Sequence, residues 1–293
     1  MASYGKFQSD NKKYGLNNRD NYNPEFNPTI SAKSEKQKTT FDKNLHKWVN
    51  FVSWARWNPD LLLDLLKPEK GGINLHSDQR VFLRGILRFV SVYGVFPRGW
   101  GKTWNEVMAS ILACMLFPNM EIALTAQTKQ NSAELLKSKF DEICKQYPLI
   151  KNEVIQTKFS KDDAEILFAN GSKLDTLANS QTSKGQRRRR IQIEESALLD
   201  NILFEDALEP IVEIGRSTVG GLGIINPEEL NQQINFFTTS GFRGSDEYIR
   251  SLNMLRNMRD LKGEIILGSN WMLGCWNGRG STKEQILKKK KRM

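Results

Sequence analysis

The residues best suited to chemistry lie in the segment 95–104, which reads VFPRGWGKTW. Residues 101–103, Gly-Lys-Thr, match the end of a phosphate-binding loop. In such a loop, backbone N–H groups of the turn and the following helix hold nucleotide phosphates, the lysine neutralises charge and the threonine hydroxyl holds Mg²⁺. An apolar run at 89–96 precedes the segment and a helix-compatible stretch at 103–117 follows it, as the motif requires. The consensus also needs a glycine where Phe96 stands, so only the second half of the motif is present.

A pair of acids follows the short apolar stretch at 191–193. Glu194 would hold Mg²⁺ through water, and Glu195 would orient or deprotonate an attacking water. The first of these positions is usually an aspartate, so Glu194 is a departure that reaches one methylene further. Two exposed acids at a helix N-terminus, favoured there by the helix dipole, would give the same sequence. Their position about ninety residues after Gly-Lys-Thr, in the same α/β pattern, favours the catalytic interpretation.

A third apolar strand, predicted at 234–240, ends in the hydroxyl residues Thr238, Thr239 and Ser240. In motor ATPases such a strand lies beside the acidic strand, where its hydroxyls can sense the γ-phosphate. A Thr-Thr-Ser strand end is common in proteins. The element therefore supports the other two motifs and has little specificity alone.

The framework that must position these motifs can be read from apolar spacing and turn signals. Helical patterns occur at 41–57, 61–66, from Ser77 onward, at 103–117, 129–147 and 196–214. Strand patterns occur at 89–96, 121–126, 164–168, 173–177, 189–193, 234–240 and 264–267. Asn170-Gly171 predicts a hairpin between two of these strands, and 215–223 reads as a glycine-rich loop. The alternation predicts an α/β fold of the P-loop NTPase type: a mainly parallel sheet flanked by helices, with an N-terminal helical segment.

The same patterns predict the domain organisation. We expect a disordered or extended arm at 1–40, a helical segment at 41–90 packed on the motor, a P-loop ATPase domain at 91–270 and a basic tail at 271–293. No apolar run approaches 18 residues and the N-terminus has no apolar signal region, so we expect a cytosolic protein without a membrane segment.

Composition points to an anionic partner. The chain has 43 basic and 33 acidic residues, a net charge of +10, and nucleic acid is the commonest partner of such proteins. Two basic runs, 187–190 and 288–292, contribute nine of the positive charges, although either could simply be solvated. The three cysteines and two histidines have no metal-ligand spacing, and we expect Cys114 and Cys144 to be buried, reduced thiols.

One family combines these motifs in this order. Gln79, the segment 98–103, Glu194-Glu195 and 238–240 resemble the ATPase half of the large terminase subunit of tailed bacteriophages, the motor that packs DNA into proheads. The resemblance covers roughly residues 45 to 285 and is more specific as an ordered set than any single motif. That family typically lacks the first glycine of the loop and carries an arginine in it, which agrees with Phe96.

The resemblance implies a role for each motif residue. Gln79 would read adenine through its amide, unless it is only a glutamine on a helix surface. Arg98 would act in cis on the β- and γ-phosphates, because a planar guanidinium suits phosphate oxygens. The remaining roles are ATP binding by the loop residues Gly99, Trp100, Gly101, Lys102 and Thr103, Mg²⁺ binding by Thr103 and Glu194, catalysis by Glu195 together with Arg98 and Glu194, and coupling by Thr238, Thr239 and Ser240. Lys184 or Arg187 could enter the site of a neighbouring subunit, and the sequence leaves the choice open.

The resemblance also implies partners and a location. It implies ATP and Mg²⁺, double-stranded DNA, a homo-oligomeric ring, a portal protein and a small terminase subunit, in the cytoplasm of the infected bacterium at the prohead portal. Large terminases usually continue into a nuclease domain with clustered metal-binding acids, whereas the tail from Gly268 holds a single acid, Glu284, so we expect no DNA cleavage by this chain. A helicase of another P-loop family and a non-enzymatic basic DNA-binding protein remain alternatives.

Overall fold

The computed structural model describes residues 43–213, 232–239 and 241–268. The expected N-terminal arm at 1–40, the loop at 215–223, Ser240 and the basic tail at 271–293 lie outside the described residues. Within the described part of the chain, no helix has the length and apolar character needed to cross a membrane.

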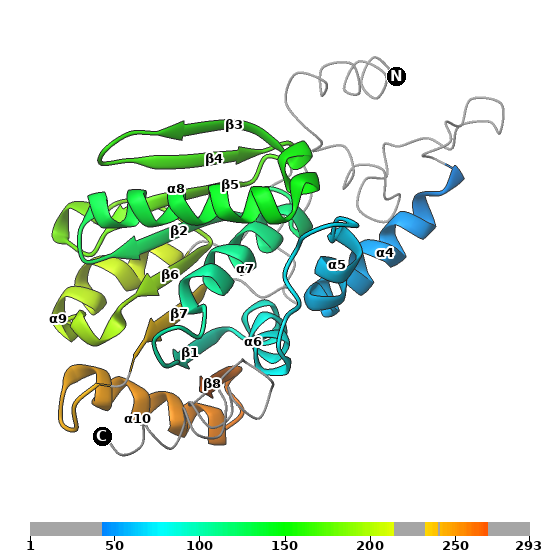
Figure 1. Cartoon of the computed structure of the whole chain (residues 1–293). Helices are drawn as coiled ribbons and strands as arrows, with labels where there is room; N and C mark the ends of the chain where they lie inside the picture. Colours follow the sequence, from blue (N-terminus) through cyan, green and yellow to red (C-terminus); the bar gives the residue numbers. More distant parts are fainter. Residues whose placement is uncertain (1–42, 214–231, 240, 269–293) are drawn as a thin grey trace, which may run out of the picture.

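A single large sheet forms the centre of the molecule (Figure 1). Within the described ranges its strands are β1 (Ser91–Val95), β2 (Glu121–Ala126), β3 (Val154–Phe159), β4 (Ala164–Phe168), β5 (Lys173–Ala178), β6 (Arg190–Glu194), β7 (Gln233–Thr238) and β8 (Glu264–Gly268). Their order across the sheet is β3-β4-β5-β2-β6-β7-β1-β8. All pairs from β5 to β8 are parallel, whereas β3–β4 and β4–β5 are antiparallel. The carboxyl ends of β1, β6 and β7 therefore meet at one edge of the sheet.

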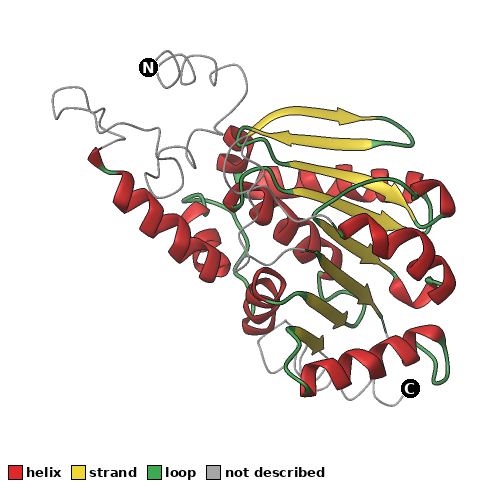
Figure 2. Ribbon diagram, turned by 180° about the vertical axis from the view of Figure 1, so that it is seen from behind, coloured by secondary structure: helices red, strands yellow, loops and turns green. Residues whose placement is uncertain are grey.

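Helices cover both faces of this sheet, so the molecule has three layers (Figures 1 and 2). On one face pack α6 (Ser77–Arg88), α7 (Lys102–Leu116) and α8 (Lys129–Gln146), with α4 (Leu45–Trp57) and α5 (Pro59–Leu66) outside them. The other face carries α10 (Asp246–Arg259) and a series of short turns: η3 (Ser196–Leu198), α9 (Asn201–Leu203), η4 (Phe204–Leu208) and η5 (Glu209–Val212). Two further turns, η1 (Pro148–Glu153) and η2 (Gln181–Ser183), lie in connections.

Each central strand contributes side chains to the cores on both faces of the sheet, because successive side chains of a strand point to opposite faces. Ile122 and Leu124 of β2 join the core beneath α7 and α8, while Ala123 between them joins the core beneath α10. Helix α6 is fixed by a salt-bridge network on α5: the buried Asp60 lies 2.7 Å from Nε of Arg84 and 3.3 Å from an Nη atom of Arg80. This network matters for the site because α6 begins beside the phosphate loop.

The predicted fold class is confirmed, and most predicted elements lie where the sequence placed them. The hairpin at Asn170-Gly171 is formed by β4 and β5, and Cys114 and Cys144 are buried free thiols. One expectation is wrong and one strand was missed. The described part of the stretch 196–214, residues 196–213, is not one helix but four short turns, interrupted between η3 and α9. Strand β3 has no counterpart in the sequence prediction.

Candidate active site

The phosphate loop connects β1 to α7, and its backbone needs glycine at two points. Gly99 and Gly101 have φ angles of 81° and 88°, in the left-handed region that side chains other than glycine rarely adopt. A Cβ on Gly101 would also lie 3.4 Å from the Nε2 atom of Gln79 and 3.5 Å from Nδ2 of Asn105. The Asn105 amide donates to the Gly101 carbonyl at 2.8 Å, which holds the loop against the first turn of the helix.

Phe96 stands where the consensus has a glycine, and here the position has a packing role because the Phe96 ring is part of the core. It is 3% exposed and stacks on Trp100 with ring centroids 3.9 Å apart, and Phe82 of α6 meets it edge-on at 5.1 Å. The Trp100 indole is buried too, and its Nε1 donates to Asp78 at 2.6 Å. The Trp100 side chain therefore anchors the loop to α6, and Trp100 does not line the pocket.

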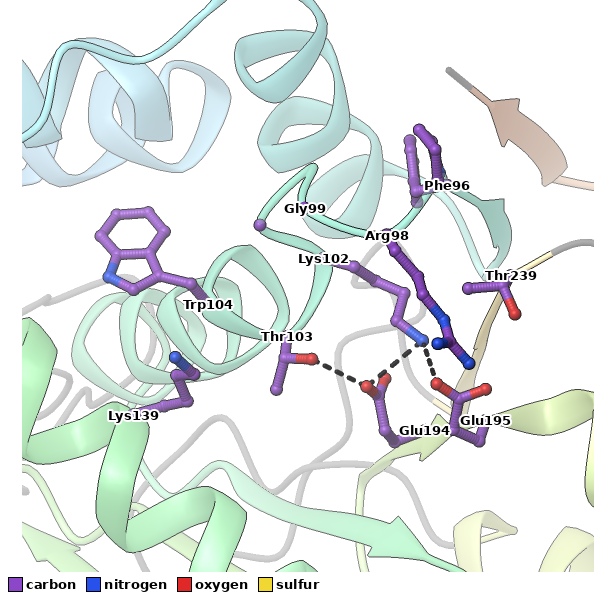
Figure 3. Close-up of a pocket in the computed structure, with 12 residues that line it drawn as sticks. Phe96, Arg98, Gly99, Lys102, Thr103, Trp104, Lys139, Glu194, Glu195 and Thr239 are labelled. Atoms are coloured by element: carbon purple, nitrogen blue, oxygen red, sulfur yellow. Dashed lines mark hydrogen bonds and ion pairs between the residues drawn. The ribbon is translucent and has the colours of Figure 1, made fainter. Parts of the chain in front are cut away.

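A pocket of about 300 Å³ lies between the loop and the ends of β6 and β7 (Figure 3). Helix α7 begins at Lys102, so the backbone N–H groups of its first turn have no partner within the helix and are available to an anion. The predicted residues that line the pocket are Arg98, Gly99, Gly101, Lys102, Thr103, Glu194, Glu195 and Thr239. Phe96, Pro97, Trp104 and Lys139 line it in addition, and the sequence analysis assigned a site role to none of them.

The centre of the pocket is an ion-pair cluster built from both motifs. The Nζ atom of Lys102 lies 3.2 Å from Oε1 of Glu194 and 3.1 Å from Oε1 of Glu195. The Thr103 hydroxyl donates to Oε1 of Glu194 at 2.8 Å. Figure 3 shows Arg98 reaching into the same space beside Lys102. Residues about ninety positions apart in the sequence are thus in direct contact, as the catalytic interpretation requires.

Burial and charge oppose each other at Lys102. Burial alone lowers its pKa, but the carboxylates of Glu194, Glu106 and Glu195 outweigh burial and raise the pKa above its ordinary value. The charged lysine is therefore the stable form at neutral pH. Glu195 differs from Glu194 because its side chain is 46% exposed, against 6% for Glu194, so Glu195 has access to solvent.

Glu106 is a site residue that the sequence analysis missed. It is completely buried one turn after Lys102 on α7, beside Glu194. Burial, and then the charge of Glu194, raise the pKa of Glu106 well above its ordinary value, which favours the neutral acid. The only sequence signal was its spacing of four residues from Lys102, which places both side chains on one face of the helix.

Gln79 is buried at 7% exposure, so it is not the helix-surface residue of the alternative interpretation. Its Nε2 atom donates to the Trp100 carbonyl at 3.2 Å, and its Oε1 atom accepts from the His76 backbone N–H at 3.0 Å. Gln79 thereby connects the N-terminus of α6 to the phosphate loop. It does not line the pocket, and its adenine-reading role stays a prediction.

Strand β7 pairs with β1 on one side and with β6 on the other, so the hydroxyl strand lies between the two other motifs. Thr238 is completely buried, and its hydroxyl has no hydrogen-bond partner among the described residues. Thr239 lines the pocket opposite Thr103 (Figure 3). Ser240, the third predicted coupling residue, lies outside the described residues.

The basic run at 187–190 is not a solvated face. Arg188 forms a buried bidentate pair with Asp175, and Arg190 is 1% exposed with its guanidinium over the Phe117 ring. Of the two candidates for action on a neighbouring subunit, Lys184 lies 2.6 Å from Asp206 on the surface, and Arg187 is exposed. The action of either residue on a neighbouring subunit stays a prediction.

Comparison with solved structures identifies the fold. The large terminase of bacteriophage HK97 superposes with a TM-score of 0.53 at 13% identity, over 75% of this chain and 48% of that chain. The large terminase of a thermophilic bacteriophage, in complex with ADP, gives 0.53 at 12% identity over 74% and 49%, and its complex with ATP-γ-S gives 0.52 at 13% over 75% and 49%. The chain has the fold of a large terminase over about half of that protein's length. No protein-family model and no curated protein matches the sequence.

Proposed function

We propose that this chain is the ATP-hydrolysing motor of a terminase large subunit, which translocates double-stranded viral DNA into a prohead. The observation that carries the proposal is the contact of Lys102 with Glu194 and Glu195 at the N-terminus of α7. A phosphate-binding lysine and two acids at the end of a nearby strand, here β6, which is separated from β1 by β7, are parts that ATP hydrolysis uses. The fold shared with the thermophilic phage's large terminase, which binds ADP and ATP-γ-S, supports ATP as the nucleotide.

In the proposed hydrolysis, each residue of the site has a separate role. The N–H groups at the start of α7 bind phosphate oxygens, and Lys102 turns from the carboxylates towards the β- and γ-phosphates. Glu195 orients a water and accepts its proton as the water oxygen attacks the γ-phosphorus. The bond between that phosphorus and the bridging oxygen breaks, leaving ADP and phosphate. Arg98 reduces the charge that develops on the β- and γ-phosphate oxygens.

Thr103 and Glu194 fit a magnesium site. They present a hydroxyl and a carboxylate that are 2.8 Å apart, and Mg²⁺ prefers such hard oxygen ligands. The Glu194 side chain is 6% exposed and its Oε1 atom accepts from the Thr103 hydroxyl, so the two oxygen groups meet at one point of the pocket. When bound, Mg²⁺ would neutralise phosphate charge.

We propose that Thr238, Thr239 and Ser240 couple this chemistry to movement. Thr239 faces the pocket and Thr238 belongs to the strand between the loop strand and the acidic strand, so a change at the γ-phosphate reaches both. The net charge of +10 supports double-stranded DNA as the partner. We extend the proposal to a homo-oligomeric ring that meets a portal protein and a small terminase subunit at the prohead, in the cytoplasm of the infected bacterium.

The decisive experiment compares two site variants with one surface control. Lys102→Ala should abolish ATP hydrolysis and weaken ATP binding, because the phosphates lose their charge partner. Glu195→Gln should bind ATP like the wild type but stop turnover. Lys137→Ala, which removes an exposed lysine of α8, should leave both unchanged. A Glu195→Gln preparation that hydrolyses ATP at the wild-type rate would refute the assignment of Glu195.

The DNA part of the proposal has its own test. Binding through phosphate contacts should fall steeply with salt and should not distinguish a duplex from its scrambled version. A strong sequence preference that persists at high salt would contradict a translocating motor. We also propose that the chain does not cut DNA, so supercoiled plasmid should stay intact with Mg²⁺ or Mn²⁺. Cleavage that disappears on mutation of an acid in this chain would refute this.

A further inference from the structure

We propose that Arg250, on helix α10, is a positioning residue for Glu195: its guanidinium holds the turn that follows β6 and thereby aims the Glu195 carboxylate at the attacking water. The inference rests on the proposed ATPase function, and it adds to that function a residue that none of the motifs contains. Arg250 does not line the pocket and does not contact Glu194 or Glu195. It acts on Glu195 through the backbone of the turn that follows it.

The first step concerns the backbone of Glu195. Its φ and ψ angles are 52° and 48°, so a residue with a long side chain adopts the left-handed conformation that normally favours glycine. Such a conformation persists only where the surrounding structure enforces it, and it is concentrated at functional sites. It bends the chain sharply between strand β6 and turn η3, and it leaves the Glu195 side chain half exposed beside Lys102. Some contact must therefore hold this turn.

Arg250 supplies that contact from the opposite side. Its guanidinium donates to the Ser196 carbonyl at 3.3 Å, to the Leu199 carbonyl at 3.2 Å and to Oδ1 of Asn201 at 2.6 Å. These three acceptors span the whole turn that begins directly after Glu195. A planar guanidinium presents its N–H groups in a fixed fork, so it can hold these three acceptors in one defined geometry, whereas a lysine ammonium is a compact point charge on a flexible stem.

The guanidinium is itself held in place. Arg250 is 7% exposed, and its charge lies 5.1 Å from the ring centre of Phe236 in β7 and 5.6 Å from that of Phe204. Burial lowers the pKa of Arg250, and this effect outweighs that of the neighbouring Tyr93 and acids. Removing a charge from water costs free energy that an apolar side chain of the same size would not cost. The presence of an arginine here therefore favours a role that depends on where its N–H groups point.

Helix α10 is anchored to the other two catalytic strands as well. Glu247, three residues before Arg250, accepts a hydrogen bond from the hydroxyl of Tyr93 in the loop strand β1. The backbone of Gly241, just beyond the coupling strand, packs so closely on Glu247 that a Cβ at Gly241 would lie 1.9 Å from a carboxylate oxygen. One helix thus contacts the strand of the phosphate loop, the turn after the acid and the chain after the coupling strand.

The test is a comparison of Arg250→Met with Arg256→Met. Methionine keeps the apolar stem but cannot donate, and Arg256 is an exposed arginine of the same helix whose side chain donates to Oδ1 of Asn253. Because a misplacement of about 1 Å can reduce turnover about 100-fold, Arg250→Met should lower kcat by about that factor. The KM for ATP and the binding of a fluorescent ATP analogue should stay within about twofold of wild type. Arg256→Met should match the wild type in all respects.

Two further variants protect the test against misfolding and against a purely structural role. Asn201→Ala removes one acceptor of the guanidinium and should lower kcat several-fold without changing KM. In a Glu195→Gln background, the residual hydrolysis rate measured in single turnover with enzyme in excess should fall almost no further on Arg250→Met, because the carboxylate that it positions is already absent. A kcat within twofold of wild type for Arg250→Met, or equal losses in both backgrounds, would refute the inference alone. A wild-type chain without ATPase activity would refute the proposed function, and this inference with it.

Discussion

Replacement of Lys102 by methionine should destabilise the folded protein as well as stop hydrolysis. Lys102 is 9% exposed and contacts two carboxylates, of which Glu194 is 6% and Glu195 is 46% exposed. The contact with Glu195 is screened by solvent and contributes little to stability. The contact with Glu194 is buried, and loss of the lysine leaves a buried carboxylate without its cation. Methionine has a similar length, so the loss of packing is small and the change is mainly electrostatic.

The size of the effect follows from the burial of the pair. Breaking a buried ion pair by removal of one partner typically costs about 3–5 kcal/mol. We therefore expect Lys102→Met to lose about 3–4 kcal/mol of unfolding free energy at pH 7. A second change, Glu194→Gln, should restore most of the stability because no buried charge remains, but it should not restore hydrolysis.

Urea unfolding followed by circular dichroism measures this directly. Wild type, Lys102→Met and the double variant are compared at pH 7 in nucleotide-free buffer, and equal m-values show that the extent of unfolding is the same. A loss below about 1 kcal/mol at pH 7 would show that solvent reaches the pair and that our description of its burial is wrong. A double variant no more stable than Lys102→Met would show that the loss comes from packing and not from charge.

Three further predictions use other contacts of the same site. Phe96→Ala should cost about 3–5 kcal/mol in urea unfolding, because a buried ring stacked on Trp100 is lost; a cost below about 1 kcal/mol would show that the loop tolerates a small residue there. Gly101→Ala should cost about 1–2 kcal/mol and reduce ATP affinity, because its φ angle of 88° strains alanine; unchanged stability and binding would contradict this. Burial raises the pKa of Glu106, so the folded state keeps the Glu106 proton at a pH where the unfolded state has released it. The free energy of unfolding of the wild type therefore falls as the pH rises above about 4.5. Glu106→Gln should therefore be more stable than wild type at pH 7 and equal to it near pH 4. If the stability advantage of Glu106→Gln in urea unfolding shrinks as the pH rises, Glu106 is not neutral in the folded protein.

The sequence predicted the elements whose signal is local. Strand β2 has the predicted bounds, Glu121–Ala126, because it is a short, mainly apolar run between turn residues. The Asn170-Gly171 turn determined the β4–β5 hairpin in the same way. The three motifs could be combined from the sequence because parallel strands place their carboxyl ends at one edge of a sheet, and the contact of Thr103 with Glu194 follows from that arrangement.

Features without a local signal could not be predicted. Strand β3 lies at the sheet edge with its middle residues exposed, so it has no apolar alternation to reveal it. Glu106 reads as an ordinary acid of an amphipathic helix, and only the packing of α7 in the fold buries it. Arg250 reads as one of several arginines on α10, and its partners are 49 to 54 positions away in the sequence. In each case the chemistry depends on which neighbour the fold supplies.

Charge balance at the site supports the role that we propose for Arg98 of the phosphate loop. Lys102 is the buried cation of the cluster, and the charge of Glu194 alone is enough to offset it. Glu195 adds a further negative charge, and ATP would bring several more to the same pocket. Arg98, which reaches into the pocket beside Lys102, and a divalent ion held by Thr103 and Glu194 would supply the positive charge that is missing. The neutral form of Glu106 keeps the negative charge of the site lower. A third carboxylate charge beside Glu194 would repel any phosphate that enters the pocket.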